Sequence, residues 1–433
     1  AANIDTPTPA ATDAARANAR DMLARTDRTL AAMRAMQNAA RNNANKGPNN
    51  LGKNPLKPTV TLPNVPNGLG TGGLKVSGNV TTDPSKWKGA KLPTQTVNNG
   101  KTKVTIKQTE QQALLEWETF NIGKNTTLTF DQSKGGENAG QWIAFNKVSD
   151  PSANPTQILG KLNADGQVYI LNPNGILFGG SSQVNTRGLT ASALPINDNL
   201  VKQGLLNNRD AQFLFSGLSV PGGSDGTPGF NPETPADGKF GDVIVQKGAS
   251  LTSPAGSGGN GGRIMLVGAN VTNEGTISTE SGQTILAAGL QVAVAAHNSD
   301  DPSLRGLDVW VGDVGTYAGT VINNGIIDAP TGSISLTGKN LVQAGVLDST
   351  TSVNLNGRID LKASYGAVAN PNFDSDTDEG SGGPMFLNQF TGTVTFGEGS
   401  STRILPDYAS KKTVPGLELP QRSQINIEGL AVH

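Results

Sequence analysis

The chain of 433 residues is rich in glycine (55) and proline (25) and contains no cysteine. Its low shares of hydrophobic (35%) and charged (16%) residues favour one elongated repeat domain of short strands and tight corners over several compact globules. The lack of cysteine excludes disulfides and thiolate chemistry, and the formal net charge of -1 gives no bulk attraction to nucleic acid, which we do not expect as a partner.

The first segment, residues 1–46, is predicted to contain a short amphipathic α-helix over residues 13–41. Thr12 or Asp13 can cap its amino end, and Gly47 and Pro48 end it. We expect this helix either to dock on a partner or on the end of the fold, or to lie on the domain as a marginal helix. Residues 47–73 are rich in Asn, Pro, Gly and Lys, which predicts a linker or an extended surface segment.

The rest of the chain alternates short apolar runs with glycine, asparagine and aspartate. The most distinctive stretch sets Asn172, Pro173, Asn174 and Gly175 between two strand-like runs. Both asparagines can bond their own backbone in Asx turns, the proline restricts φ, and the glycine is free to adopt a positive φ. This pattern predicts a stiff corner between two β-strands.

An internal repeat indicates how the strands are arranged. The pattern Gly-x-Ile-x-Leu-x-Gly-x-Asn begins at Gly262 and again at Gly332, and the related Gly325 and Gly345 are 20 residues apart. A spacing of about 20 residues is typical of one coil of a parallel β-helix, so the chain would form roughly 12 to 16 coils. Alternate side chains then point into the tube, stacked coils bury a continuous apolar column, and corner asparagines can form a ladder.

Candidates for catalysis or metal binding are few. His297 and His433 are the only histidines, and we expect both at the surface. Residues 374–380 imitate the start of a calcium loop, but Glu379 and Met385 occupy the positions where an EF-hand needs glycine and glutamate, which favours a solvated insertion. No set of acidic and basic residues at repeat-compatible spacing stands out. We therefore expect no enzymatic activity, no cofactor and no metal.

A series of motifs between residues 117 and 192 carries a family resemblance. The motifs are Trp-Glu-Thr-Phe-Asn-Ile-Gly from Trp117, Leu-Thr-Phe at 128–130, Ala-Phe-Asn-Lys-Val at 144–148, Gln-Ile-Leu-Gly at 157–160, the corner at 172–175 and Gly-Leu-Thr-Ala-Ser at 188–192. In this order they resemble the haemagglutination-activity domain of filamentous-haemagglutinin-like exoproteins, in its high-molecular-weight-adhesin branch. The resemblance covers roughly residues 74–300. Phe145 and Lys147 depart from the family pattern Ala-Leu-Asn-Arg-Val.

The resemblance and the repeat together predict an all-β fold. We expect a right-handed parallel β-helix with an amino-terminal cap and extra hairpins, preceded by the short α-helical segment. Residues 74–300 would be the two-partner secretion domain, and residues 301–433 would add further coils at the start of a longer shaft. The expected secretion and folding residues are Trp117, Phe120, Asn121, Gly123, Asn146, Asn172, Pro173, Asn174 and Gly175.

The resemblance also implies a function. The chain would be the secretion signal of a large exported adhesin, bound in the periplasm by the polypeptide-binding domains of an outer-membrane β-barrel transporter, and would nucleate folding at the cell surface. Because the chain ends after strand-like residues 424–427 without a polar closing coil, we expect further parts that contact host or bacterial surface receptors. Two alternatives are an extracellular structural fibre whose coils associate end to end, and a β-helix polysaccharide lyase.

Overall fold

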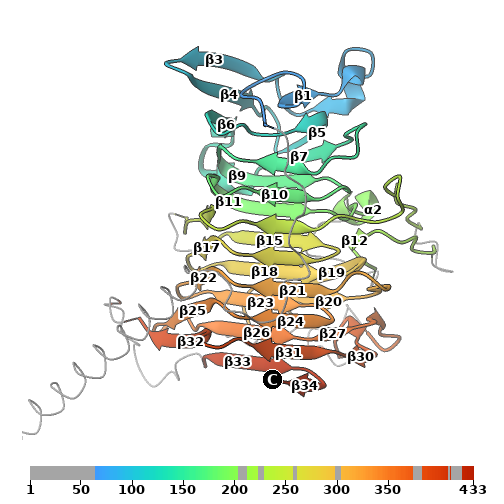
Figure 1. Ribbon diagram of the computed structural model, residues 1–433, viewed down its shortest axis with the longest axis vertical. Helices are drawn as coiled ribbons and strands as arrows, with labels where there is room; N and C mark the ends of the chain where they lie inside the picture. The colour runs from blue at the N-terminus through green and yellow to red at the C-terminus, as the bar shows by residue number, and fades with distance from the viewer. Residues whose placement is uncertain are drawn as a thin grey trace, which may run out of the picture.

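The computed structural model describes residues 64–202, 212–222, 229–256, 261–297, 304–373, 383–407, 410 and 422–433. The expected helix at 13–41, positions 47–63 of the expected linker and the acidic segment 374–380 lie outside the described residues. The described chain winds into a right-handed parallel β-helix, with its coils stacked along the vertical axis of Figure 1. The predicted fold class is confirmed.

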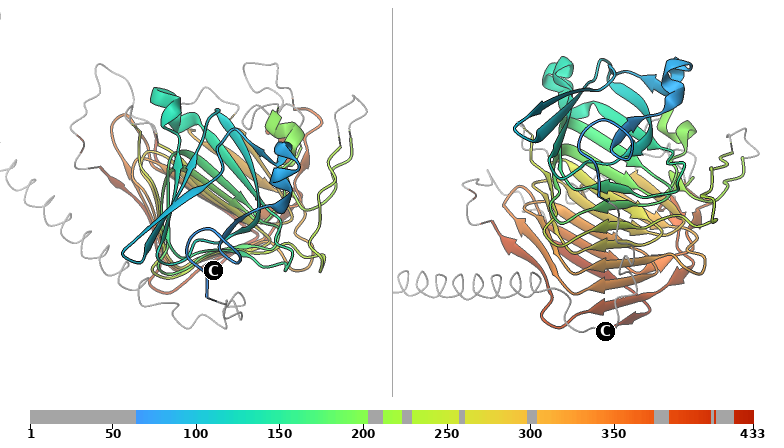
Figure 2. Two further views of the ribbon diagram at one scale, coloured as in Figure 1. Left: turned by 90° about the horizontal axis from the view of Figure 1, so that it is seen from above. Right: turned by 45° about the horizontal axis from the view of Figure 1, so that its top comes forward.

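Three ladders of parallel strands form the faces of the tube, which Figure 2 shows from above. The first face contains β4 (Lys101–Lys107), β6 (Thr126–Asp131), the first halves of β9 (Lys161–Leu171) and β11 (Gln183–Ser192), β14 (Ser250–Ser253), β17 (Thr276–Thr279), β22 (Ile326–Ala329), β25 (Val346–Thr351) and β32 (Ser401–Pro406). The second face contains β5 (Gln112–Phe120), β7 (Ile143–Val148), the second halves of β9 and β11, β15 (Arg263–Gly268), β18 (Gln283–Ala288), β23 (Ser333–Thr337), β26 (Arg358–Lys362) and β33 (Gln424–Glu428). The third face contains β8 (Thr156–Ile158), β10 (Ile176–Phe178), β13 (Val243–Val245), β16 (Val271–Asn273), β21 (Thr320–Asn323), β24 (Asn340–Gln343), β31 (Thr393–Phe396) and β34 (Ala431–Val432).

The interior column follows from the alternation in the sequence. Ile264 pairs with Thr284, which pairs with Ile334, and Ile334 pairs with Ile359 in the next coil. The three isoleucines are fully buried, since every second side chain of a strand points to the same face. The two long repeats therefore lie two coils apart, with the strand that contains Thr284 between them. The spacing of 20 residues is confirmed as one coil where Ile326 pairs with Val346.

A cap of antiparallel strands covers the amino end of the tube, at the top of Figure 1. Its elements are β1 (Leu74–Val76), β2 (Trp87–Lys88), the 3-10 helices η1 (Gly78–Thr81) and η2 (Pro84–Lys86), and β3 (Thr94–Asn98), which forms a hairpin with β4. Both β1 and β2 pair with β5 in antiparallel orientation. A further 3-10 helix, η3 (Ser133–Gln141), lies between β6 and β7. These elements confirm the predicted amino-terminal cap.

Extra hairpins lie outside the tube and explain why the described coils are fewer than expected. They comprise α2 (Asp198–Lys202), the antiparallel sheet of β12 (Phe215–Ser216), β19 (Gln291–Ala296) and β20 (Leu307–Val311), and the pairs β27 (Ser364–Tyr365) with β30 (Phe390–Thr391) and β28 (Val368–Ala369) with β29 (Phe386–Leu387). They cover a second apolar cluster on the outer side of the second face, which includes Tyr169, Met265 and Ile285. The first face contains nine strands among the described residues, fewer than the roughly 12 to 16 coils expected.

Candidate functional site

Asn121, directly after β5, joins the cap to the coils below it. Its backbone N–H donates to Gly73 O at 3.1 Å, and its side-chain Nδ2 donates to Gly72 O at 3.1 Å. Its Oδ1 accepts the backbone N–H of Gln157 in β8 at 2.8 Å. The side chain is buried, with 7% of the residue exposed. One amide therefore pairs backbone groups of the cap and of the next coil, which would be costly to leave unpaired.

Gly123 allows the loop before β1 to lie directly against the first coil. A Cβ atom at this position would lie 2.5 Å from both Pro66 O and Asn67 Oδ1, a distance that no side chain could tolerate. The same Asn67 Oδ1 accepts the backbone N–H of Asn125 at 2.9 Å and the Thr126 hydroxyl at 3.2 Å. Close backbone approach is thus the physical reason for glycine here.

Trp117 and Phe120 form a cluster of aromatic rings beneath the cap. The Trp117 ring lies 5.1 Å from the ring of Trp87 and 5.1 Å from that of Phe120, both in edge-on geometry. Its indole Nε1 donates to Asn146 Oδ1 at 2.9 Å, and Asn146 Nδ2 donates to Tyr169 O at 3.0 Å in the next coil. Trp117, Phe120 and Asn146 are fully buried. Asn146 thereby provides a hydrogen-bond partner for the indole N–H of Trp117 inside an apolar core.

The predicted corner is a tight turn in the structure. Gly175 N donates to Asn172 O at 2.9 Å, and Gly175 has a φ of 110°, in the region that favours glycine. Asn172 Oδ1 accepts the backbone N–H of Asn174 at 3.0 Å, which is the expected Asx turn. The Asn174 side chain behaves differently from the prediction, because its Nδ2 donates to Asn172 Oδ1 at 3.1 Å instead of forming its own backbone turn.

The corner is bonded to the coils on both sides of it. Towards the amino end, Asn172 Nδ2 donates to Thr156 Oγ1 at 3.1 Å, and Thr156 N donates to Gly175 O at 3.0 Å. Towards the carboxyl end, Gly241 N donates to Pro173 O at 2.8 Å. A Cβ on Gly175 would lie 2.8 Å from Asp242 O, so the two coils are in close backbone contact here.

The two groups of predicted residues are thus connected through β8. Thr156 is bonded to the corner, and the adjacent Gln157 is bonded to Asn121 under the cap. The cap residues Asn67, Gly72 and Gly73 were not predicted as site residues, since their segment was predicted to be a linker or an extended surface segment. Their only signal is the density of glycine and asparagine just before the first strand.

The two departures from the family pattern have local partners on the outer side of the second face. The Phe145 ring lies 4.8 Å from the Tyr169 ring in the outer apolar cluster. Lys147 Nζ forms an ion pair with Asp198 Oδ2 at 3.1 Å, and Asp198 begins α2. Phe145 thus packs against the neighbouring strand β9 of the same face, and Lys147 contacts α2 outside the tube.

The chemistry of this site is that of amides, aromatic rings and glycines, which pair backbone groups and pack against one another. Within the described residues, no group of three or more His, Cys, Asp or Glu side chains is placed to hold a metal ion. In the same part of the chain, no helix is both long and apolar enough to cross a membrane.

Comparisons with known proteins relate the chain to one family. The family model described as the TPS secretion domain matches residues 79–378. Two heme/hemopexin-binding proteins of Haemophilus influenzae are similar in sequence: one is 36% identical over 121 residues (27% of this chain and 12% of the relative), and one from strain Rd is 27% identical over 337 residues (76% and 31%). The chain thus spans less than a third of either relative. The crystal structure of the HMW1 secretion domain from Haemophilus influenzae aligns with a TM-score of 0.42 and 19% identity, covering 79% of this chain and 84% of that one.

Proposed function

The chain belongs to the family of TPS secretion domains, and on that premise we propose that it is the secretion signal of a larger exported exoprotein of the adhesin type. Domains of this family pass through the periplasm by two-partner secretion to the cell surface or the extracellular space. Their partner is an outer-membrane transporter. The finer proposal is that the transporter's periplasmic domains bind the chain unfolded, and that the cap and the corner are the first parts to fold outside.

The continuous bonding from cap to corner supports this order of folding. Gly72 and Gly73 bind Asn121, Asn121 binds β8, and β8 binds the corner at Asn172. A coil of a solenoid contacts only its neighbours, so each new coil needs the preceding coil as a template. The first coils have a cap instead of a preceding coil, and the site residues are those that hold this cap in place.

Folding outside the cell would bias transport in one direction. Each coil that docks buries apolar side chains such as Val168 and Ile176, which are essentially unexposed in the folded tube. Burial contributes about 25 cal/mol per Å² of apolar surface, so a docked coil opposes return of the chain through the transporter without any need for ATP. Extended segments of the unfolded chain would meanwhile add to sheet edges of the transporter's periplasmic domains through backbone hydrogen bonds.

The test compares two glycines with positive φ in different coils. Gly175 (φ 110°) lies in the corner, and Gly319 (φ 102°) lies just before β21, far from the amino end. Either Gly175→Val or Gly319→Val should lower the free energy of unfolding by roughly 1 to 3 kcal/mol, because valine is strained at positive φ. We expect secreted yield with the transporter co-expressed to fall several-fold more for Gly175→Val than for Gly319→Val.

Asn121→Ala is expected to behave like Gly175→Val, because it disconnects the cap from β8. The readouts are secreted protein in the medium and thermal unfolding of the same purified variants. Equal secretion defects for the two glycine variants, at equal loss of stability, would contradict a special role for the corner.

A further inference from the structure

A cavity of about 270 Å³ opens on the outer side of the second face. Its wall includes Arg263, Gln283 and Ser333, which occupy the same register position in three successive coils. Arg305, from the segment that leads into β20, closes another side. The remaining wall is mostly glycine, at the corners that precede β15 and β18. A small molecule entering this cavity would therefore meet two guanidinium groups and exposed backbone.

The two arginines of the cavity have no acidic partner among the described residues. The Nε atoms of Arg263 and Arg305 are enclosed and form no hydrogen bond there. Arg305 Nη2 donates to two carbonyl oxygens, of Thr331 at 2.9 Å and Asn356 at 2.6 Å, which fix its position without neutralising its charge. Burial lowers the pKa of both guanidinium groups, as expected for a desolvated cation without a counter-ion.

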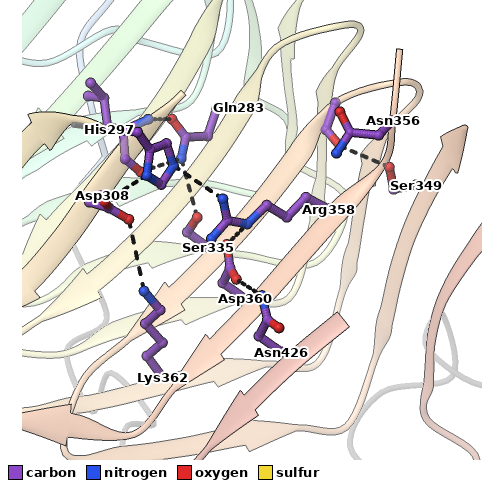
Figure 3. A network of polar contacts seen from close by, with 12 residues as sticks. Gln283, His297, Asp308, Ser335, Ser349, Asn356, Arg358, Asp360, Lys362 and Asn426 are labelled. Atoms are coloured by element: carbon purple, nitrogen blue, oxygen red, sulfur yellow. Dashed lines mark hydrogen bonds and ion pairs between the residues drawn. The ribbon is translucent and has the colours of Figure 1, made fainter. Parts of the chain in front are cut away.

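In the polar network next to the cavity, by contrast, positively and negatively charged side chains are paired. Figure 3 shows Arg358, one coil below Ser333, paired with Asp360 at 2.8 Å and in contact with His297 Nε2 at 3.2 Å. Gln283 Nε2 donates to Leu307 O and its Oε1 accepts Leu307 N, both at 2.9 Å. Gln283 thus holds the start of β20 against the coils. The network fixes the wall of the cavity but supplies no negative charge to it.

We propose that this cavity binds an oxyanion group, namely the carboxylate, sulfate or phosphate of a small molecule or of an acidic sugar. The anion would be held between Arg263 and Arg305, with the Ser333 hydroxyl as a further donor. Charge-assisted hydrogen bonds from guanidinium groups are the strong ones for such ligands, and the paired strands already hold the donors in place. The anion would also supply a counter-charge that the described residues do not provide.

The first experiment titrates the 433-residue chain with sodium sulfate by calorimetry, with sodium chloride adjusted to keep the ionic strength constant. We expect saturable binding that weakens at least tenfold in Arg263→Gln. Lys103→Gln is the matched control, because it removes one exposed positive charge from β4, away from the cavity. Equal binding by Arg263→Gln and the unmodified chain, or loss of binding in Lys103→Gln, would overturn the proposal.

The second experiment determines which kind of molecule carries the anionic group. It also locates the bound anion without the use of a variant. Titrations with acetate, glucuronate and neutral glucose separate a small free anion from an acidic sugar: equal binding of acetate and glucuronate indicates the former, and tighter glucuronate binding the latter. Crystals soaked in selenate should show anomalous density between Arg263 and Arg305. An empty cavity in these crystals, or binding of glucose as tight as that of glucuronate, would refute the proposal.

Discussion

At the scale of single residues, Asp242 lies in the next coil, directly against the corner at 172–175. Its Oδ1 accepts the backbone N–H and the side-chain Nδ2 of Asn270, both at 3.0 Å. Burial raises the pKa of this carboxyl group, and the bonds from Asn270 only partly oppose the shift. Its carbonyl oxygen meanwhile accepts Ile176 N at 3.0 Å, just after the corner. A charge is therefore buried where two coils are in close backbone contact.

The raised pKa of Asp242 predicts a pH dependence. The folded chain binds this proton more tightly than the unfolded chain, so stability should fall as the pH rises from about 3.8 through the folded pKa. Asp242→Asn keeps an oxygen acceptor for Asn270 without the charge, so it should flatten this dependence and be at least as stable at pH 7. Urea unfolding between pH 4 and pH 8 measures both effects.

Asp131 serves as the control, because its pKa is shifted in the opposite direction to that of Asp242. Hydrogen bonds from the Ser133 hydroxyl and backbone N–H lower the pKa of Asp131, so its contribution is present above about pH 3.8 and is lost as the pH falls through its folded pKa. Asp131→Asn should therefore cost a little stability at pH 7. A wild-type chain that gains stability over Asp242→Asn as the pH rises would contradict the assignment for Asp242.

At the scale of elements, the hairpin of β19 and β20 is held to the second face by the polar network in Figure 3. His297 Nδ1 pairs with Asp308 Oδ2 at 2.7 Å across the hairpin, and Lys362 Nζ of β26 lies 3.9 Å from Asp308 Oδ1. Burial raises the pKa of Asp308, but the hydrogen bond from His297 and the nearby cations outweigh it, and the pKa is lowered overall. The expectation of a surface histidine was wrong for His297, whose side chain is only 10% exposed.

His297→Ala should loosen this hairpin and leave the tube intact. The substitution removes the partner of Asp308 and the contact to Arg358, at a cost of roughly 1 to 3 kcal/mol. Hydrogen exchange should become faster in Gln291–Ala296 and Leu307–Val311 but stay unchanged in β4 and β6. His433→Ala, at an exposed position, is the control. Unchanged exchange in the hairpin would show that its apolar cluster alone holds it.

At the scale of the whole molecule, a ladder of amides inside the third face links successive coils. Asn273 Nδ2 donates to Asn323 Oδ1 at 2.8 Å, and Asn323 Nδ2 donates to Gln343 Oε1 at 2.8 Å. Gln343 Nε2 then donates to Ser401 O at 3.0 Å. All three side chains are fully buried. The predicted asparagine ladder is therefore present, with a glutamine as its last amide.

Asn323→Val should break this ladder in the middle. It leaves a buried donor on Asn273 and a buried acceptor on Gln343 unpaired, each costing about 1 to 3 kcal/mol. The urea midpoint of the whole chain should fall accordingly, while Asn185→Val, at an exposed position of β11, should have little effect. A midpoint as high as that of the unmodified chain would mean that the ladder contributes nothing to stacking.

The sequence by itself determined the coil and its corners. The alternation around Ile264 and Ile334, the 20-residue spacing of Gly325 and Gly345, and the turn at Gly175 are local features, because strand period and turn geometry depend on neighbouring residues. For the same reason the tight turn at residues 172–175 could be predicted from the sequence.

Only the tertiary structure decided which distant residues meet. Asp242 lies under a corner about 70 positions earlier, Gly72 lies against Asn121, and Arg263 shares a cavity with Arg305. These pairs depend on the length of each insertion and on the register between coils, which backbone pairing sets coil by coil. No local pattern in the sequence encodes that register, because insertions such as the hairpin of β19 and β20 change the number of residues between stacked positions without changing the stack.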